Sequence, residues 1–316
     1  MEDEFAFIAR RLRPLATAPG ALGLADDAAL LDPRPGMQLV LTKDAMVAGV
    51  HFLEDDPAGQ VARKLLRVNL SDLAAMGAAP IGYLLALARP RVIEDEWLAA
   101  FCAGLAEDHA AFGISVLGGD TVSTPGPLTL SLTAIGEVPK GKVLLRNGAR
   151  SGDDIWVSGT LGDAALGLAV LQGVLEVAEP VRARLVERYR LPQPRLALGQ
   201  ALRGLAHAAI DISDGLLADL GHIVEASGLG AEIRAELLPL AAPDLPGAQD
   251  AALSGGDDYE LLFTTPRSRR DAIERLTEKL DLPLTRIGAM QAAAGIRVLD
   301  ATGAEVHPKH TGWQHF

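Results

Sequence analysis

The pattern of apolar and polar residues divides this chain into alternating strands and helices. In the first half, short apolar runs predict strands, and longer stretches with a helical period predict two helices. The strands are expected at 37–42, 81–88, 114–117 and 128–138, and the helices at 57–76 and 94–112. The next segment, 139–154, is polar and rich in glycine, lysine and arginine, which is typical of a linker. We therefore expect a boundary there, between a domain at 1–140 and another at 149–316.

The second half shows the same mixture of periods. Apolar runs predict strands at 155–157, 207–210 and 259–264. Helical periodicity predicts helices at 163–171, 181–189, 195–206, 215–227 and 267–280. Because strands and helices are mixed in both halves, the sequence predicts an α/β or α+β fold.

The composition limits the class of protein. The chain has 316 residues, of which 49% are apolar and 22% charged, so it is large enough for two packed cores. Its net charge of −12 argues against a nucleic-acid binder, which needs a basic face. The longest apolar stretch, 164–178, contains Gln172 and Glu176 and is too short to span a membrane. The acidic start and the single cysteine, Cys102, favour a cytoplasmic protein without disulfides.

Asp72 occupies an unexpected position on the helix predicted at 57–76. At about 100° per residue, Asp72 falls in the middle of an apolar stripe. The stripe consists of Val61, Leu65, Val68 and Met76, and the other side carries Arg63, Lys64, Arg67 and Ser71. An unpaired carboxylate on a buried face is costly or becomes neutral. The sequence therefore predicts that Asp72 has a cation or a buried arginine as partner, or lies only at the edge of the core.

Other aspartates follow apolar runs and stand beside glycine or small hydroxyl residues. They are Asp26, Asp27, Asp44, Asp120, Asp211, Asp214, Asp257 and Asp258. Carboxylates with open positions hold hard cations such as Mg²⁺, and neighbouring glycines allow the backbone to approach a phosphate. Since strand ends are where sites of α/β proteins assemble, the pattern predicts a site for metal and nucleotide phosphate built from distant parts of the chain.

Each of these motifs also has a simpler explanation. Ser213 or Asp214 is a natural N-cap for the helix predicted at 215–227, whereas the functional alternative uses the same helix N-terminus to bind an anion. Plain turns explain the glycines at 118–121 and 254–260 as well as phosphate loops do. The stretch 136–143 is rejected as a P-loop because Val143 replaces the required Ser or Thr.

Taken together, these runs resemble the thiamine-monophosphate kinases, of the superfamily that includes aminoimidazole ribonucleotide synthetase. The matching stretches follow one another along nearly the whole chain, at 26–30, 47–52, 69–78, 118–121, 209–216, 253–261 and 312–316. The most specific combination is Asn-Leu-Ser-Asp-Leu-Ala-Ala-Met-Gly-Ala at 69–78 with Ser-Gly-Gly-Asp-Asp-Tyr-Glu at 254–260. The resemblance implies a two-domain fold, with an N-terminal mixed-sheet domain that dimerises and a C-terminal α/β domain that completes the site.

The resemblance also implies an activity, which is phosphorylation of thiamine monophosphate to thiamine diphosphate by ATP and several Mg²⁺ ions. The implied metal ligands are Asp26, Thr42, Lys43, Asp44, Asp72, Asp120, Asp211 and Asp214, and Asp72, Asp120 and Asp211 are the implied catalytic residues. The implied contacts to ATP are Gly119, Asp120, Arg146 and Ser213, and those to thiamine monophosphate are His51, Asp257 and Trp313. Members of the family are homodimers.

Three positions depart from the pattern of the family. Lys43 stands where a threonine is usual, Asp257 replaces a common glutamate, and Ala25 replaces a glycine. A charged lysine side chain cannot ligate a metal, so Lys43 has three possible roles: it replaces the charge of one cation, contacts phosphate directly, or points away while its backbone carbonyl ligates the metal. Two alternatives remain beside a kinase. One is another ATP-dependent enzyme of the superfamily, which the mid-chain position of Cys102 disfavours, and the other is a binder without activity.

Overall fold

The computed structural model describes residues 4–308, 310 and 312, and it divides the chain into two compact units. The first unit comprises the residues up to 73 together with 78–141, and the second comprises 74–77 together with the residues from 142 onward. The chain passes from one unit to the other inside the polar segment 139–154. Within the described residues, no helix combines the length and the hydrophobicity needed to cross a membrane.

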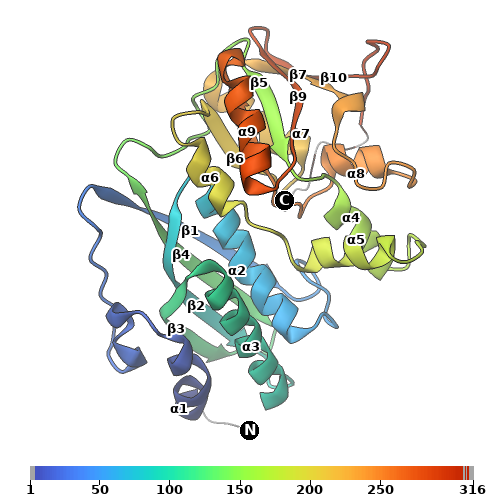
Figure 1. Ribbon diagram of the computed structural model, residues 1–316. Helices are drawn as coiled ribbons and strands as arrows, with labels where there is room; N and C mark the ends of the chain where they lie inside the picture. The colour runs from blue at the N-terminus through green and yellow to red at the C-terminus, as the bar shows by residue number, and fades with distance from the viewer. Residues whose placement is uncertain (1–3, 309, 311, 313–316) are drawn as a thin grey trace. The chain divides into compact units, whose positions relative to one another are not determined.

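The first unit is built on a mixed four-stranded sheet of order β1-β4-β2-β3 (Figure 1). β4 pairs antiparallel with β1 and β2, and β2 pairs parallel with β3. The strands are β1 (Met37–Val47), β2 (Ala79–Arg89), β3 (Ser115–Ser123) and β4 (Thr129–Pro139). Two helices, α2 (Ala58–Ala75) and α3 (Asp95–Phe112), cover one face (Figure 1). Short helical segments precede β1: α1 (Glu4–Phe7), η1 (Ile8–Leu12), η2 (Arg13–Leu15) and η3 (Pro19–Leu24).

The two faces of this sheet differ in burial because side chains alternate along each strand. On β2, Tyr83 and Leu85 are buried on the helix face, and the Tyr83 hydroxyl lies 2.7 Å from His109 Nε2 of α3. Leu84 and Ala86 point the other way and are exposed. We call this second side the open face.

The second unit is built on a six-stranded sheet of order β10-β7-β9-β5-β8-β6. Its pairs are antiparallel except β10 with β7. The strands are β5 (Asp154–Ser158), β6 (Ala208–Asp211), β7 (Gly230–Arg234), β8 (Leu261–Thr265), β9 (Leu284–Gln291) and β10 (Gly295–Leu299). The helices are α4 (Asp163–Leu171), α5 (Val181–Arg190), α6 (Leu196–Leu202), α7 (Leu216–Ser227), α8 (Ala248–Ser254) and α9 (Arg270–Leu280), with short turns η4 (Ala235–Leu237) and η5 (Arg267–Arg269).

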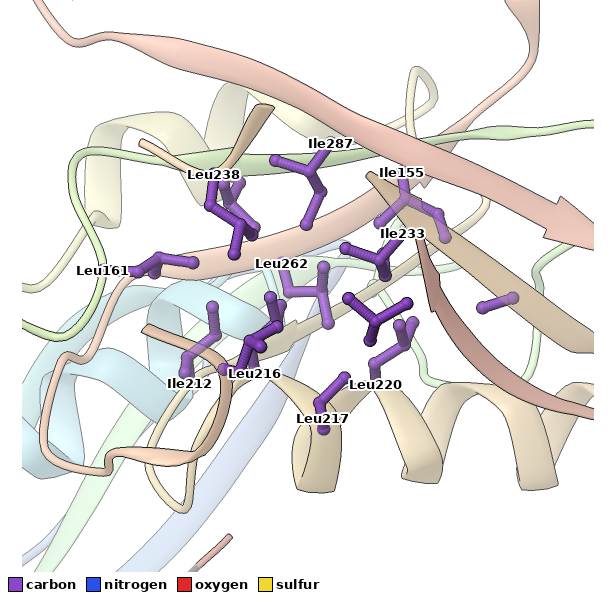
Figure 2. Close-up of a cluster of buried hydrophobic side chains, with 14 of the residues drawn as sticks. Ile155, Leu161, Ile212, Leu216, Leu217, Leu220, Ile233, Leu238, Leu262 and Ile287 are labelled. Atoms are coloured by element: carbon purple, nitrogen blue, oxygen red, sulfur yellow. The ribbon is translucent and has the colours of Figure 1, made fainter. Parts of the chain in front are cut away.

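Hydrophobic clusters cover both faces of the second sheet. Figure 2 shows one of them, in which Leu216 and Leu220 of α7 pack against Ile155, Ile233 and other strand residues. The second cluster places α6 and α9 against Trp156 and Phe263. Because both faces of the sheet are covered, every residue of β5 and β8 is buried, and burial does not alternate along these strands.

The helix α2 differs from the amphipathic helix predicted from the sequence. Lys64, Arg67 and Ser71, which were assigned to its polar side, are buried, whereas Asp72 is only half-buried. The reason is a partner on the adjacent helix, since Arg67 forms a bidentate ion pair with the fully buried Asp108 of α3, with N–O distances of 2.7 and 2.9 Å. Of the three explanations for Asp72, a position at the edge of the core agrees with the observed burial.

Candidate functional site

Thr42, Asp44 and Asp72 lie together on the helix face of the first sheet. Alternation along β1 directs Thr42 and Asp44 to this face and Lys43 to the open face. The Thr42 hydroxyl donates a hydrogen bond to Asp72 Oδ2. The Asp44 backbone N–H donates to Asn69 Oδ1 of α2 at 3.2 Å. Asn69 is not among the predicted site residues, yet it helps to hold β1 and α2 in register, which brings two carboxylates and a hydroxyl side by side.

Asp44 and Asp72 form an acidic pair with an unfavourable electrostatic environment. Burial of Asp44, followed by the charge of Asp72, raises the pKa of Asp44 from 3.8 to about 7. A cation beside the two carboxylates would lower this pKa again because it favours their ionised forms. The pair therefore has the oxygen donors and the charge that suit a hard cation.

The open face of the first sheet carries a cavity of about 700 Å³. Lys43, Thr133, Leu84 and Gly118 form one row across its strands, and Asp120 belongs to the next row. Both rows line the cavity. Segments that precede β1 line its other parts, among them Phe7, Ile8, Leu12, Leu24, Asp26 and Asp27. The volume is typical of a small-molecule site, and the lining combines apolar and charged side chains.

The glycines at 118 and 119 lie inside β3, so the prediction of a turn after 117 was wrong. The pairing of β2 with β3 shifts by one residue between Tyr83 and Leu84, which marks a β-bulge. A Cβ on Gly119 would lie 1.9 Å from the carbonyl oxygen of Leu85, so no other residue fits there without a shift of the backbone. The bulge is followed by Asp120, which is exposed and lines the cavity.

His51 lies in the turn that follows β1. Its ring Nδ1 accepts a hydrogen bond from the Val47 N–H at 3.1 Å, so Nε2 carries the proton in the neutral ring. Its carbonyl oxygen accepts a hydrogen bond from Lys64 Nζ at 3.2 Å. This contact gives the buried Lys64 a partner, and the two hydrogen bonds together fix the position of the His51 ring.

The end of β6 and the loop that leads to α7 carry the predicted residues Asp211, Ser213 and Asp214. Asp211 is buried at the end of β6. Asp219 Oδ2 accepts hydrogen bonds from the backbone N–H groups of Ser213, Asp214 and Gly215 at 3.0, 3.1 and 3.2 Å. Neither Ser213 nor Asp214 is the N-cap, and these three N–H groups are not open to an anion as expected, because Asp219 already occupies them. The loop therefore offers its side chains, rather than these three N–H groups, to a ligand.

Asp257 packs directly against this loop. Its backbone N–H donates to the Ser213 carbonyl oxygen at 2.8 Å, and its φ of 69° lies in the left-handed region. A Cβ on Gly256 would lie 2.5 Å from the same Ser213 oxygen, so the close approach requires glycine. The run 254–260 and the loop of Ser213 are thus one local structure, which brings Ser213, Asp214 and Asp257 together.

The other two acids of the run 254–260 are structural. Asp258 Oδ2 accepts a hydrogen bond from the Gly162 N–H at 2.7 Å, and burial raises the pKa of Asp258 to about 8. Glu260 is fully buried and accepts hydrogen bonds from the Ser158 hydroxyl at 2.6 Å and from Arg188 at 2.8 Å. Asp257 is the acid of this run that remains partly exposed.

The remaining predicted contacts lie in or beyond the loops of the second unit. Arg146 is exposed before β5, and its carbonyl oxygen accepts a hydrogen bond from Ser227 Oγ at 3.3 Å. Gly312 packs beside the helix start, since a Cβ there would lie 2.8 Å from the Asp214 carbonyl oxygen. Trp313 follows Gly312 in the chain and lies outside the described residues.

The predicted metal ligands lie in several separate parts of the chain. Across residues 4–308, 310 and 312, no three or more His, Cys, Asp or Glu side chains gather closely enough to hold a metal ion by themselves. Among the predicted ligands, Asp44 interacts with Asp72, and Asp72 accepts the hydrogen bond of Thr42. Mg²⁺ is commonly held by one or two carboxylates together with substrate phosphates and water, so the pair fits this mode of binding.

Sequence comparison matches both parts of the chain to known families. Residues 25–138 match the AIR synthase related protein, N-terminal domain, and residues 150–300 match the corresponding C-terminal domain. The thiamine-monophosphate kinase of Caulobacter vibrioides is 46% identical over 99% of this chain and 90% of its own length. The thiamine-monophosphate kinase of Salmonella typhimurium is 43% identical over 99% of this chain and 98% of its own length.

Structural comparison gives the same group of proteins. The crystal structure of thiamine-monophosphate kinase from Stenotrophomonas maltophilia K279a has a TM-score of 0.83 and 47% identity, and the match covers 90% of this chain and 93% of the other. A structure of AaThiL complexed with AMPPCP and TMP has a TM-score of 0.79 and 32% identity, covering 97% and 99%. The hydrogenase maturation protein HypE shares the fold at 20% identity, with a TM-score of 0.80 over 99% of this chain and 96% of its own.

Proposed function

The chain belongs to the thiamine-monophosphate kinases of the AIR synthase related family, and from this premise we propose that it phosphorylates thiamine monophosphate with ATP, giving thiamine diphosphate and ADP. The observation that carries the proposal is the 46% identity to a thiamine-monophosphate kinase over 99% of the chain. In the direct reaction, an oxygen of the acceptor phosphate bonds to the γ-phosphorus of ATP, and the bond from that phosphorus to the oxygen bridging to the β-phosphorus breaks. ADP leaves with the electron pair of that bond.

Charge is the main obstacle to this reaction. Two unit charges 4 Å apart repel by about 4 kcal/mol at an effective dielectric constant of about 20. Mg²⁺, when bound, neutralises phosphate charge and aligns the two reactants. Several Mg²⁺ ions are proposed, and the residues proposed to hold them are Asp26, Thr42, Asp44, Asp72, Asp120, Asp211 and Asp214. Because the acceptor is already an ionised phosphate, the chain needs no general base, which explains an acidic site without a catalytic histidine or cysteine.

The cavity on the open face is the proposed nucleotide site. Its apolar lining by Phe7, Leu12 and Leu24 suits a purine ring, and its polar lining includes Gly119 and Asp120, the predicted contacts to ATP. Gly118 puts no side chain into the row of Lys43 and Leu84, so a phosphate can approach the backbone of β3 there. Arg146 and Ser213 are further proposed contacts to ATP.

His51, Asp257 and Trp313 are the proposed contacts to thiamine monophosphate. In the neutral ring His51 Nε2 carries a proton, which it can donate to a phosphate oxygen. The carboxylate of Asp257 attracts the cationic thiazolium ring of the substrate. Trp313 can stack on an aromatic ring of the same molecule.

A homodimer in the cytoplasm completes the proposal. Outside the cavity lining, the open face of the first sheet exposes Leu41 and Val122, and Leu41 is 63% exposed. Exposed apolar residues on one sheet face suit a second copy of the same chain, as expected of this family. A cytoplasmic setting supplies ATP and keeps Cys102 reduced.

The proposal is tested by incubating the protein with ATP, Mg²⁺ and thiamine monophosphate. We expect thiamine diphosphate and ADP in equal amounts, measured by chromatography. A folded protein that binds ATP but releases no thiamine diphosphate would overturn the assignment. Sedimentation of the same preparation should give a dimer.

A further inference from the structure

We propose that Lys43 binds the phosphates of the nucleotide directly, as a cation built into the open face of the first sheet. The inference rests on the proposed function of that face as the nucleotide site. It gives Lys43 a role different from that of Thr42 and Asp44, its two neighbours in the sequence.

The Lys43 side chain points to the open face of the first sheet. Thr42 contacts Asp72 and Asp44 is held by Asn69, so both neighbours of Lys43 belong to the helix face. Alternation along β1 sends Lys43 to the other side. It shares a row with Thr133, and it is exposed and lines the cavity. Lys43 therefore cannot share a metal with the side chains of Thr42 and Asp44 on the helix face.

Acidic residues outnumber basic ones in the described lining of the cavity. Its described lining contains three acids, Asp26, Asp27 and Asp120, and Lys43 is the cation among these lining residues. A polyphosphate entering a cavity with more acids than cations is repelled unless positive charge is present. Lys43 supplies one such charge without a metal ion.

The ammonium group of Lys43 is available to a ligand. The interactions of the described residues include no ion pair of Lys43, whereas Lys64 of α2 is buried and donates a hydrogen bond to the His51 carbonyl oxygen. The flexible stem of four carbons lets the Nζ of a lysine reach across neighbouring rows of the sheet. A phosphate oxygen is a suitable acceptor because charge-assisted hydrogen bonds are the strong ones.

The test is equilibrium binding of AMPPCP, which resists hydrolysis, and of adenosine, which has no phosphates. Both are titrated into the unaltered protein, Lys43→Met and Lys279→Met by calorimetry, in EDTA to exclude metal. Lys279 is an exposed lysine near the end of α9 and serves as the matched control. We expect Lys43→Met to weaken AMPPCP binding roughly 10- to 100-fold and to leave adenosine binding unchanged. Lys279→Met should change neither.

Several outcomes would overturn the inference. Equal binding of AMPPCP to Lys43→Met and to the unaltered protein would remove Lys43 from the phosphates. Equal weakening of adenosine binding and AMPPCP binding would indicate a distorted cavity rather than the loss of a phosphate contact. An unaltered protein that binds AMPPCP but makes no thiamine diphosphate would refute the proposed function and leave the assignment of Lys43 to the phosphates standing. An unchanged unfolding temperature of Lys43→Met shows that the variant is folded, so that a difference in AMPPCP affinity reflects binding and not stability.

Discussion

Replacing Asp108 by asparagine tests how α2 is held in the first unit. Asp108 is fully buried on α3 and accepts hydrogen bonds from Arg67 at 2.7 and 2.9 Å and from Arg63 at 3.0 Å. Asparagine has the same shape but no charge, so the buried guanidinium of Arg67 loses its counter-charge. Removing one partner of a buried ion pair costs about 3–5 kcal/mol. We therefore expect the thermal unfolding midpoint of the first unit to fall by roughly 6–20 °C.

Glu107 provides a matched control for Asp108. It is the preceding residue and also pairs with Arg63, at 2.7 Å, but it is 62% exposed. An exposed pair contributes about 0–1 kcal/mol, so Glu107→Gln should lower the midpoint by only a few degrees. Differential scanning calorimetry of both variants gives the comparison. If the two substitutions have equal effects, or if Asp108→Asn costs less than about 1 kcal/mol, the buried charge is not what holds the two helices together.

Three further predictions concern the site and its supports. Asp72→Asn should lower kcat at least roughly 100-fold. The unfolding midpoint should stay nearly unchanged, because Asp72 is half-buried and asparagine can still accept the Thr42 hydrogen bond. Unfolding of the variant would show a structural role for Asp72 instead. Gly256→Ala should reduce kcat/KM for thiamine monophosphate, since a Cβ would meet the Ser213 carbonyl oxygen at 2.5 Å. Gly221→Ala on α7 is the control, because a Cβ there would have no neighbour within 4 Å, and it should stabilise the folded protein by about 0.5–1 kcal/mol. Equal effects of the two substitutions on kcat/KM would contradict this prediction. Burial lowers the pKa of His109 from 6.5 to about 4, so below pH 6.5 the unfolded chain binds a proton that the folded chain does not. The free energy of unfolding therefore decreases as the pH falls toward 4, by about 2 kcal/mol for a half-buried ring. His109→Gln should flatten this part of the profile of unfolding midpoint against pH.

Local patterns were sufficient for many elements but not for partners distant in the sequence. The helix at 94–112 and the strand at 128–138 lie within one residue of α3 and β4, because their periodicity is long and regular. The strands β7, β9 and β10 were not predicted from the sequence. Their positions in a sheet covered on both faces depend on pairing with distant strands rather than on local alternation.

The candidate site shows the same limit at the level of single residues. The sequence singled out Asp211, Asp214 and Asp257, but not Asp219, whose carboxylate takes the three N–H groups at the start of α7. Asp219 is one helical turn after Gly215, so its spacing was the available signal. The buried ion pair of Arg67 had no local signal, because Asp108 lies on another helix, and the helical stripe of α2 was misassigned for that reason.

The strand β1 carries consecutive residues with separate roles, and this makes its length as important as its composition. Thr42 and Asp44 face α2, whereas Lys43 faces the cavity. Substitution at one of these positions leaves the direction of the other two unchanged. A deletion or insertion of one residue within β1 would reverse every following side chain. Lys43 would then point under α2 and Asp44 into the cavity, so evolution can exchange residues along this strand but cannot change its length by one.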